Sequence, residues 1–292
     1  MKKLLILSGK GGTGKTTTAS AFIHFARAKA MADCDVDAPN LHLVMNRKTE
    51  PRTKDFIGAE KAVIDAQKCI GCGKCMDACR FKAIIPSGEK YAVREYTCEG
   101  CGVCAYVCPK EAVTMMPDVA GKQEIYEGDR VFSTAQLKMG RGNSGKLVTE
   151  VKVELYQSAP ETELAIIDGS PGIGCPVIAS VNDVDLALIV IEPSRSGLAD
   201  LRRLVETIRI FPAKKAVSIN RWDISPEQTR AIEAFCREEE IPVMGRIPYD
   251  KTVLQAVNQG QSIADIPCPA REALFTIYKN TRKELFEGSN QT

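Results

Sequence analysis

Eight of the twelve cysteines lie between Cys69 and Cys108, in a spacing that suits metal binding. They form two runs of one pattern, in which gaps of two, two and three residues separate four cysteines. The first run is Cys69, Cys72, Cys75 and Cys79, and the second is Cys98, Cys101, Cys104 and Cys108. Three closely spaced thiolates plus a fourth suit a cubane iron–sulfur cluster, whereas zinc sites usually pair two cysteines on each knuckle. Because thiolate spacing alone also suits two zinc sites with four thiolate ligands each, these remain an alternative.

The repeat resembles the signature of the bacterial two-cluster ferredoxins. In that family, three cysteines of each run cap one cluster and the fourth ligates the other. The resemblance therefore implies two [4Fe–4S] clusters with interlocked ligand sets. One set is Cys69, Cys72, Cys75 and Cys108, and the other is Cys98, Cys101, Cys104 and Cys79. Arg80 follows the first run where proline is usual, a departure that removes no ligand.

A second group of residues predicts phosphate binding. Residues 9–16 read GKGGTGKT and satisfy the pattern G-x-x-x-x-G-K-[ST], after an apolar run and before a helical pattern. Glycines let backbone N–H groups wrap phosphates, and the helix N-terminus adds partial positive charge. We expect Lys15 to reach the β- and γ-phosphates of ATP and the Thr16 hydroxyl to ligate Mg²⁺. The predicted nucleotide-binding residues here are Gly11, Gly12, Thr13, Gly14, Lys15, Thr16 and Thr17.

Lys10 narrows the class of this loop. The string from Lys10 to Thr17 resembles the deviant Walker A motif of the MinD/ParA-type ATPases, a group that includes the nitrogenase iron protein and iron–sulfur carrier ATPases. In that group the first lysine crosses to the nucleotide of a partner subunit. The resemblance implies an ATP-dependent homodimer in which Lys10 acts in trans and, with Lys15, takes part in catalysis.

The segment from Asp33 to Leu41 fits switch I of the same family. There Asp35 matches the aspartate that positions the attacking water, a role that in-line displacement needs near the γ-phosphate, and Asp33 is expected close to Mg²⁺. The strand before it, residues 30–32, is short and weakly apolar, so this part of the sheet could be irregular or the preceding helix shorter than its pattern.

Two later segments complete the resemblance. An apolar run ends at Asp168, the Walker B position, which predicts a place in the Mg²⁺ shell, and residues 169–174 resemble the γ-phosphate-sensing switch II. Asn220 matches the asparagine that contacts adenine. Cys175 shares its offset from the Walker B aspartate with a bridging-cluster cysteine of the nitrogenase iron protein, although a small buried side chain is the simpler interpretation.

The elements that position these residues alternate between strands and helices. Apolar runs at 4–7, 164–167, 186–191 and 216–219 predict buried parallel strands, and helical patterns cover 16–29, 199–209 and 226–239. This predicts an α/β fold with a doubly wound, mostly parallel P-loop NTPase sheet. The cysteine window lacks the alternation and predicts an inserted α+β, bacterial ferredoxin-like domain with a hairpin at residues 83–93. The predicted division is ATPase at 1–58, insert at 59–117 and ATPase at 118–292.

Composition excludes several classes of function. Lys+Arg 39 against Asp+Glu 37 gives a formal charge of +2, which provides no field for nucleic acid. No apolar run reaches the roughly 20 residues that a bilayer needs, and the N-terminal apolar stretch is too short for a secretory signal. We therefore expect a cytoplasmic chain with no membrane insertion, in which a disulfide framework is disfavoured. The basic, amphipathic segment 273–283 is expected to pack as a final helix.

Together the motifs predict a Mg²⁺-dependent ATPase with two [4Fe–4S] clusters, whose ATP-driven dimer closure is coupled to electron transfer toward an unidentified redox partner. Two alternatives stay open. One is an iron–sulfur carrier or assembly ATPase that delivers a cluster to an apo-protein, and the other is a positioning or partitioning ATPase.

Overall fold

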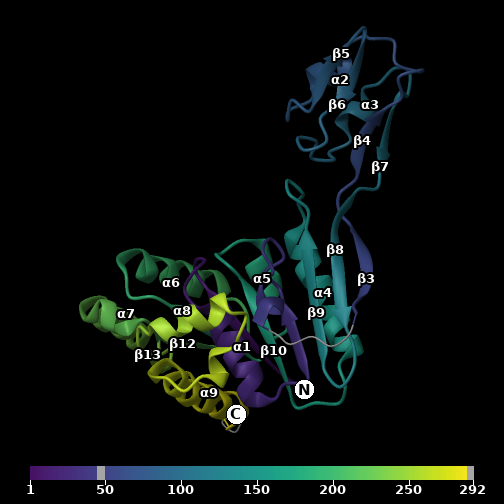
Figure 1. The fold of residues 1–292 in the computed structure, drawn as a ribbon. Helices are drawn as coiled ribbons and strands as arrows, with labels where there is room; N and C mark the ends of the chain where they lie inside the picture. Colours follow the sequence, from purple (N-terminus) through teal and green to yellow (C-terminus); the bar gives the residue numbers. More distant parts are fainter. Residues whose placement is uncertain (45–49, 288–292) are drawn as a thin grey trace. The chain divides into compact units, whose positions relative to one another are not determined.

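The computed structural model describes residues 1–44 and 50–287, which divide into two compact units (Figure 1). The first unit comprises Met1–Thr53, Gln123–Gln136 and the chain from Ser144 onward. The second comprises Lys54–Lys122 and Leu137–Asn143. Three strands carry residues of both units: β3 (Arg52–Ile57), β8 (Val119–Tyr126) and β9 (Val131–Leu137), whose last residue, Leu137, belongs to the second unit. The chain enters the second unit along β3 and leaves it along β8.

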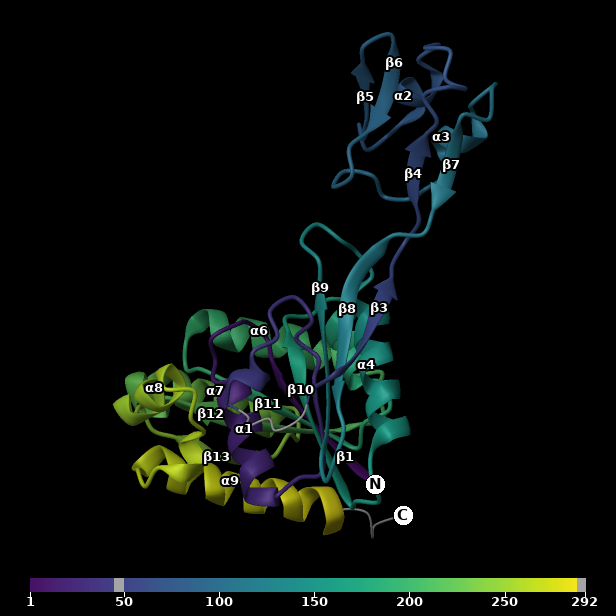
Figure 2. The same cartoon turned by 45° about the vertical axis from the view of Figure 1, so that its right-hand side comes forward.

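A nine-stranded sheet has the order β13-β12-β11-β1-β10-β2-β9-β8-β3 (Figure 2). The seven strands from β13 to β9 pair in parallel. Their bounds are β1 Lys2–Ser8, β2 Ala30–Asp33, β9 Val131–Leu137, β10 Leu164–Pro171, β11 Leu186–Ile191, β12 Lys214–Asn220 and β13 Val243–Ile247. The predicted mostly parallel α/β sheet is therefore confirmed.

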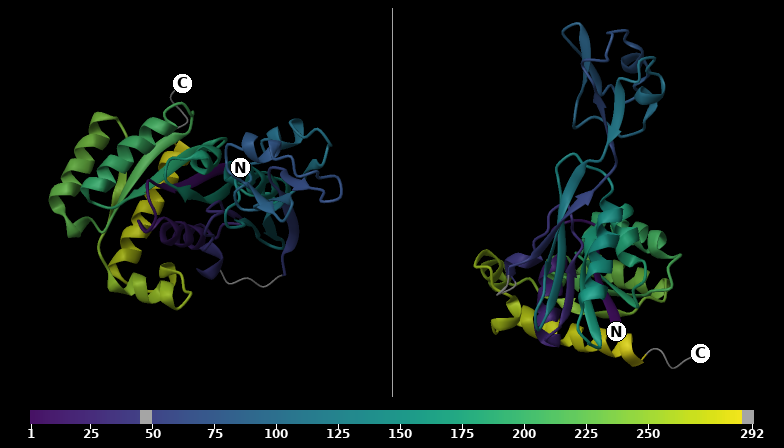
Figure 3. Two further views of the ribbon diagram at one scale, coloured as in Figure 1. Left: turned by 90° about the horizontal axis from the view of Figure 1, so that it is seen from above. Right: turned by 90° about the vertical axis from the view of Figure 1, so that its right-hand side faces the viewer.

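Helices cover both faces of this sheet (Figure 3). One layer contains α1 (Lys15–Ala26), α8 (Lys251–Asn258) and α9 (Pro269–Glu287), with the short helices η1 (Leu41–Val44) and η3 (Ile263–Asp265). The other contains α4 (Ser144–Ser158), α5 (Cys175–Val181), α6 (Arg195–Ile208) and α7 (Pro226–Glu238). A third short helix, η2 (Trp222–Ile224), follows β12. The expected C-terminal helix is present, and its apolar side is buried through Leu274, Ile277, Tyr278 and Leu285.

The central strands are apolar on both faces because both faces are covered by helices. Residues 4–7 of β1 and all of β11 are at most 1% exposed, and each such Leu or Ile contributes about 1.5–3 kcal/mol by leaving water. On the α1 side, Phe22 packs edge-to-face on Tyr278 of α9, with ring centroids 5.3 Å apart. This core fixes the ends of β1, β10 and β12, where the predicted site residues lie.

The short strand at residues 30–33 is regular rather than irregular. It is buried throughout, and it pairs in parallel with β10 and β9. The preceding helix ends at Ala26 instead of residue 29, because Arg27 takes a left-handed conformation with φ 47° that stops the helix. Position within the sheet, rather than a strong apolar run, gives this segment its burial.

The second unit contains two small antiparallel sheets and two short helices. The sheets pair β4 (Lys61–Ile64) with β7 (Val113–Met116), and β5 (Ile84–Ser87) with β6 (Lys90–Val93), which confirms the expected hairpin. The helices are α2 (Lys74–Ala78) and α3 (Val103–Tyr106). The predicted insert, residues 59–117, lies inside this unit. The unit also takes in residues 137–143, since Arg141 pairs with Asp118 at 2.7 Å and donates to the carbonyl of Glu95 at 3.3 Å.

Candidate functional site

The phosphate-binding loop connects β1 to α1, at the carboxyl edge of the parallel strands. Its Gly12 and Gly14 take left-handed conformations, with φ 81° and 94°. A Cβ at Gly14 would lie 2.4 Å from Nδ2 of Asn220, and that amide group donates to the carbonyl of Thr13 at 2.8 Å. The end of β12 therefore supports the loop directly, and Gly14 is needed both for its backbone angle and for the close approach.

Lys15, Thr16 and Asp168 form a connected polar group at the start of α1. The Lys15 ammonium donates to one carboxylate oxygen of Asp168 at 2.7 Å, and the Thr16 hydroxyl donates to the other at 2.7 Å. Asp35 lies 3.8 Å from Lys15. Burial lowers the pKa of Lys15, but the neighbouring carboxylates, Asp168 first, outweigh it and leave that pKa raised. Lys15 is therefore held as a cation next to the two predicted acidic residues.

The carboxylate of Asp33 binds backbone N–H groups of the loop that follows it. Its carboxylate accepts the backbone N–H groups of Asp35 at 3.0 Å and of Asn40 and Leu41 at 2.9 Å each. Burial and the negative charge of Asp168 raise the pKa of Asp33 to about 7. Burial also raises the pKa of Asp35, with Lys15 opposing the shift. The structure thus shows that Asp33 holds the loop carrying Asp35 and lies close to Asp168, while its expected place near Mg²⁺ stays a prediction.

Lys10 bonds within its own chain. Its ammonium lies 3.3 Å from the Ser196 hydroxyl and 4.0 Å from the Glu192 carboxylate. Glu192 also pairs with Arg221 at 2.5 Å, next to Asn220. Because the Lys10 side chain is only 35% exposed, a role on a partner's nucleotide requires it to leave these contacts.

A large cavity opens over this loop and continues across the helical layer. Its wall is formed by the loop, Asp35, Asn220, Arg221 and residues 248–250. Farther along, apolar side chains of η1 and α8, such as Leu43 and Leu254, line it. Most of the predicted nucleotide-site residues of the first unit therefore line one cavity. Lys10, Thr13 and Asp168 are not in its wall, although Asp168 bonds to Lys15 and Thr16, which are.

A buried lysine that the sequence did not single out supports the helix after switch II. Lys152 of α4 is 4% exposed, and its ammonium donates to the carbonyls of Ala179 at 3.1 Å, Ser180 at 2.9 Å and Asn182. These carbonyls lie at the C-terminal end of α5, where helices lack internal donors. Burial lowers the pKa of Lys152 to about 8. At the other end of α5, Cys175 is exposed rather than buried.

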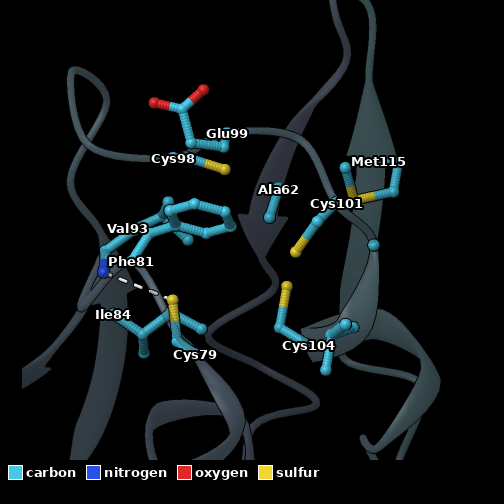
Figure 4. A pocket seen from close by; sticks show the side chains of 13 residues that line it. Ala62, Cys79, Phe81, Ile84, Val93, Cys98, Glu99, Cys101, Cys104 and Met115 are labelled. Atoms are coloured by element: carbon cyan, nitrogen blue, oxygen red, sulfur yellow. Dashed lines mark hydrogen bonds between the residues drawn. The ribbon is translucent and has the colours of Figure 1, made fainter.

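The predicted ligand cysteines surround two separate cavities in the second unit. Cavity A is lined by Cys69, Cys72, Cys75 and Cys108, and cavity B by Cys79, Cys98, Cys101 and Cys104. Each cavity takes three thiols from one run and the fourth from the other, as the ferredoxin resemblance implies. Figure 4 shows the four thiols of cavity B around a shared space, together with Phe81 and Met115.

Backbone groups help to hold the fourth thiol of each cavity. The N–H of Ala83 donates to Sγ of Cys79 at 3.3 Å, and the N–H of Ala112 donates to Sγ of Cys108 at 3.2 Å. Burial tends to raise the pKa of the Cys108 thiol, but backbone N–H groups, that of Lys110 first, lower it. Donors of this kind stabilise a thiolate, the form that ligates metal.

The thiols that line cavities A and B can be compared with the needs of a single metal ion and of a cluster. Among residues 1–44 and 50–287, no group of three or more His, Cys, Asp or Glu side chains is arranged to hold a single metal ion. A tetrahedral zinc ion needs its sulfurs about 2.3 Å away, all converging on one point. Each cavity is lined by four cysteines, which is the number of thiolates that ligate one [4Fe–4S] cluster.

Comparison with known proteins identifies the family of the first unit. The family model described as the CobQ/CobB/MinD/ParA nucleotide binding domain matches residues 4–263. The chain belongs to this family. It is 37% identical over 224 residues to an uncharacterized protein of Methanocaldococcus jannaschii, covering 75% of this chain and 78% of that one. It is 24% identical over 303 residues to an iron-sulfur cluster carrier protein of Pyrococcus abyssi, covering 98% and 87%.

Solved structures have the same fold as this chain. The cell division ATPase MinD of Pyrococcus furiosus superposes with a TM-score of 0.57 at 16% identity, covering 97% of this chain and 98% of that chain. The predicted membership of the MinD/ParA group is thus confirmed, and the chain is a nucleotide-binding P-loop ATPase of that type. No helix of the described residues has the length and apolar character to cross a membrane.

Proposed function

We propose that this protein is an ATP-dependent homodimer whose closure is coupled to electron transfer through two [4Fe–4S] clusters in its second unit. The observation that carries the proposal is the pair of cavities A and B, each ringed by four thiols of this chain. A cubane with four thiolate ligands exchanges one electron at low potential, the chemistry it would supply here.

The residues of the first unit have definite tasks in ATP turnover. Lys15 exchanges its bond with Asp168 for bonds to the phosphates. The Thr16 hydroxyl and Asp168 would hold Mg²⁺, which would neutralise phosphate charge. Asp35 orients the attacking water, on a loop that Asp33 holds in place. Asn220 contacts adenine through the amide oxygen that its bond to Thr13 leaves available.

Dimer closure depends on Lys10. On ATP binding, Lys10 leaves Ser196 and Glu192 and reaches the nucleotide of the partner subunit. Two bound nucleotides then lie at one interface between the subunits. Hydrolysis of ATP opens that interface and releases the dimer. Because Glu192 also pairs with Arg221, beside the adenine end of the cavity, nucleotide binding can loosen both contacts of Glu192 together.

A second candidate, cluster delivery, is favoured by the similarity to the iron-sulfur cluster carrier protein of Pyrococcus abyssi. Delivery needs a cluster that is readily released to an apo-protein. Four ligands from one chain around each cavity support retention instead. For this reason electron transfer is the leading proposal.

The test is to reduce anaerobically purified protein and follow electron transfer to an acceptor with and without MgATP. Wild-type protein should show a nucleotide-dependent rate or cluster potential. The Lys10→Ala variant should bind ATP without dimerising, and ATP should no longer change its electron-transfer rate or cluster potential. The Asp35→Ala variant should dimerise with ATP and keep that change, although it does not hydrolyse ATP. An unchanged rate and potential with ATP would refute the coupling, and transfer of iron and sulfide to an apo-protein would favour delivery.

A further inference from the structure

The surroundings of cavities A and B differ in charge. Among its lining residues, cavity A has two lysines, Lys74 and Lys110, and no carboxylate, whereas cavity B has one carboxylate, Glu99, and no cation. All three side chains belong to exposed residues. Their charges therefore bias the field at each cavity and are partly screened by solvent.

A second pair of lysines does not offset this difference. Lys90 donates to the carbonyl of Ala66, close to the first cysteine of cavity A, and Lys61 donates to the carbonyl of Cys98 in cavity B. Each cavity thus has one lysine fixed on a loop carbonyl. Lys61 bonds to a cavity B cysteine itself and so offsets part of the charge of Glu99. Lys90 adds to the cations near cavity A, so the excess of positive charge at cavity A remains.

Burial of the thiols acts in the same direction as the charges, while the backbone donors to the fourth thiols are matched. In cavity B both Cys98 and Cys104 are buried, with 7% and 8% exposed, whereas in cavity A only Cys75 is buried. Both cavities have one N–H donor bonded to their fourth thiol.

Reduction adds negative charge to a cluster, so nearby cations, N–H donors and water stabilise the reduced form and raise its potential. We infer that the cluster ligated by Cys69, Cys72, Cys75 and Cys108 has the higher potential, and that electrons pass from cavity B to cavity A. This inference rests on the proposed cluster assignment. One electron enters at B from an external low-potential one-electron donor protein, then moves to A, so that B is reoxidised as A is reduced.

Potentiometric titration of the cluster-loaded full-length protein, followed by EPR and without nucleotide, tests this order. We expect two steps, and the Lys74→Gln, Lys110→Gln double variant should shift only the higher step to more negative potential. Glu99→Gln is the matched control and should shift only the lower step, to more positive potential. High salt should narrow the gap between the steps, because the three side chains are exposed and screened.

The outcomes separate this inference from the proposed function. If the double variant shifts the lower step, or Glu99→Gln the higher one, the order is reversed and the inference is wrong, while both clusters remain. A single step unaffected by any variant also overturns it. A protein that shows no [4Fe–4S] signal refutes the cluster assignment itself, and with it the proposed function.

Discussion

Two glycines of one cavity B loop provide a matched pair for testing how that cavity is built. Gly100 and Gly102 both take left-handed conformations, with φ 70° and 76°. A Cβ at Gly100 would lie 2.3 Å from the carbonyl oxygen of Glu60, whereas a Cβ at Gly102 would have no heavy atom within 4 Å. Alanine at either position therefore introduces the same backbone strain, but only Gly100→Ala adds a collision with backbone.

The magnitudes follow from these two effects. A left-handed alanine costs about 1–2 kcal/mol. Overpacking adds about 1–3 kcal/mol, with no flexible side chain to yield at Gly100. We expect Gly102→Ala to lower the free energy of unfolding of the second unit by about 1–2 kcal/mol and Gly100→Ala by about 2–5 kcal/mol. Gly71→Ala should resemble Gly100→Ala, because its Cβ would lie 2.3 Å from the carbonyl oxygen of Glu89.

Anaerobic denaturant titration measures these changes in each unit separately. Visible absorption of the proposed clusters would report the second unit, while fluorescence of the one tryptophan, Trp222, reports the first. The Trp222 transition should stay unchanged in all three variants, which serves as the internal control. Equal losses in Gly100→Ala and Gly102→Ala, or a larger loss in Gly102→Ala, would show that the packing of Glu60 against this loop has no energetic role.

Three further predictions concern the first unit. Lys152→Met removes the donor for three carbonyls at the end of α5 and should lower the free energy of unfolding, followed by Trp fluorescence, by about 1–3 kcal/mol; no change contradicts this role. Burial raises the pKa of the Cys34 and Cys236 thiols to about 12. Folding therefore keeps them protonated, and between about pH 9 and 12 their stabilising contribution is lost at about 1.4 kcal/mol per pH unit for each thiol. The Cys236→Ala variant should show a smaller fall of the free energy of unfolding with pH, by about 1.4 kcal/mol per pH unit. An unchanged pH dependence contradicts the raised pKa of Cys236. Gly14→Ala places a Cβ 2.4 Å from Nδ2 of Asn220 and should weaken ATP binding, measured by calorimetry, at least about tenfold; unchanged affinity contradicts this packing.

Much of the site could be predicted because its chemistry depends on local spacing. The loop from Gly9 to Thr16 and the two cysteine runs each carry their ligands within a few residues. The strands predicted from apolar runs are also present, since buried parallel strands need no polar face.

Other features depend on contacts between distant residues and left no local pattern. Lys152 bonds to backbone carbonyls, which exist at every position, so nothing in the sequence marks its partners. Asp33 accepts backbone N–H groups that only the folded loop brings together, so its structural role has no local pattern in the sequence. The same holds for Arg141, whose pairing with Asp118 attaches residues 137–143 to the second unit.

The central claim, that cavities A and B each hold a cubane cluster, is tested most directly by measuring iron, acid-labile sulfide and zinc per chain in anaerobically purified protein. We expect about eight iron and eight sulfide per chain, two sets of four, with zinc only in trace amounts. Two zinc ions per chain without sulfide would contradict it.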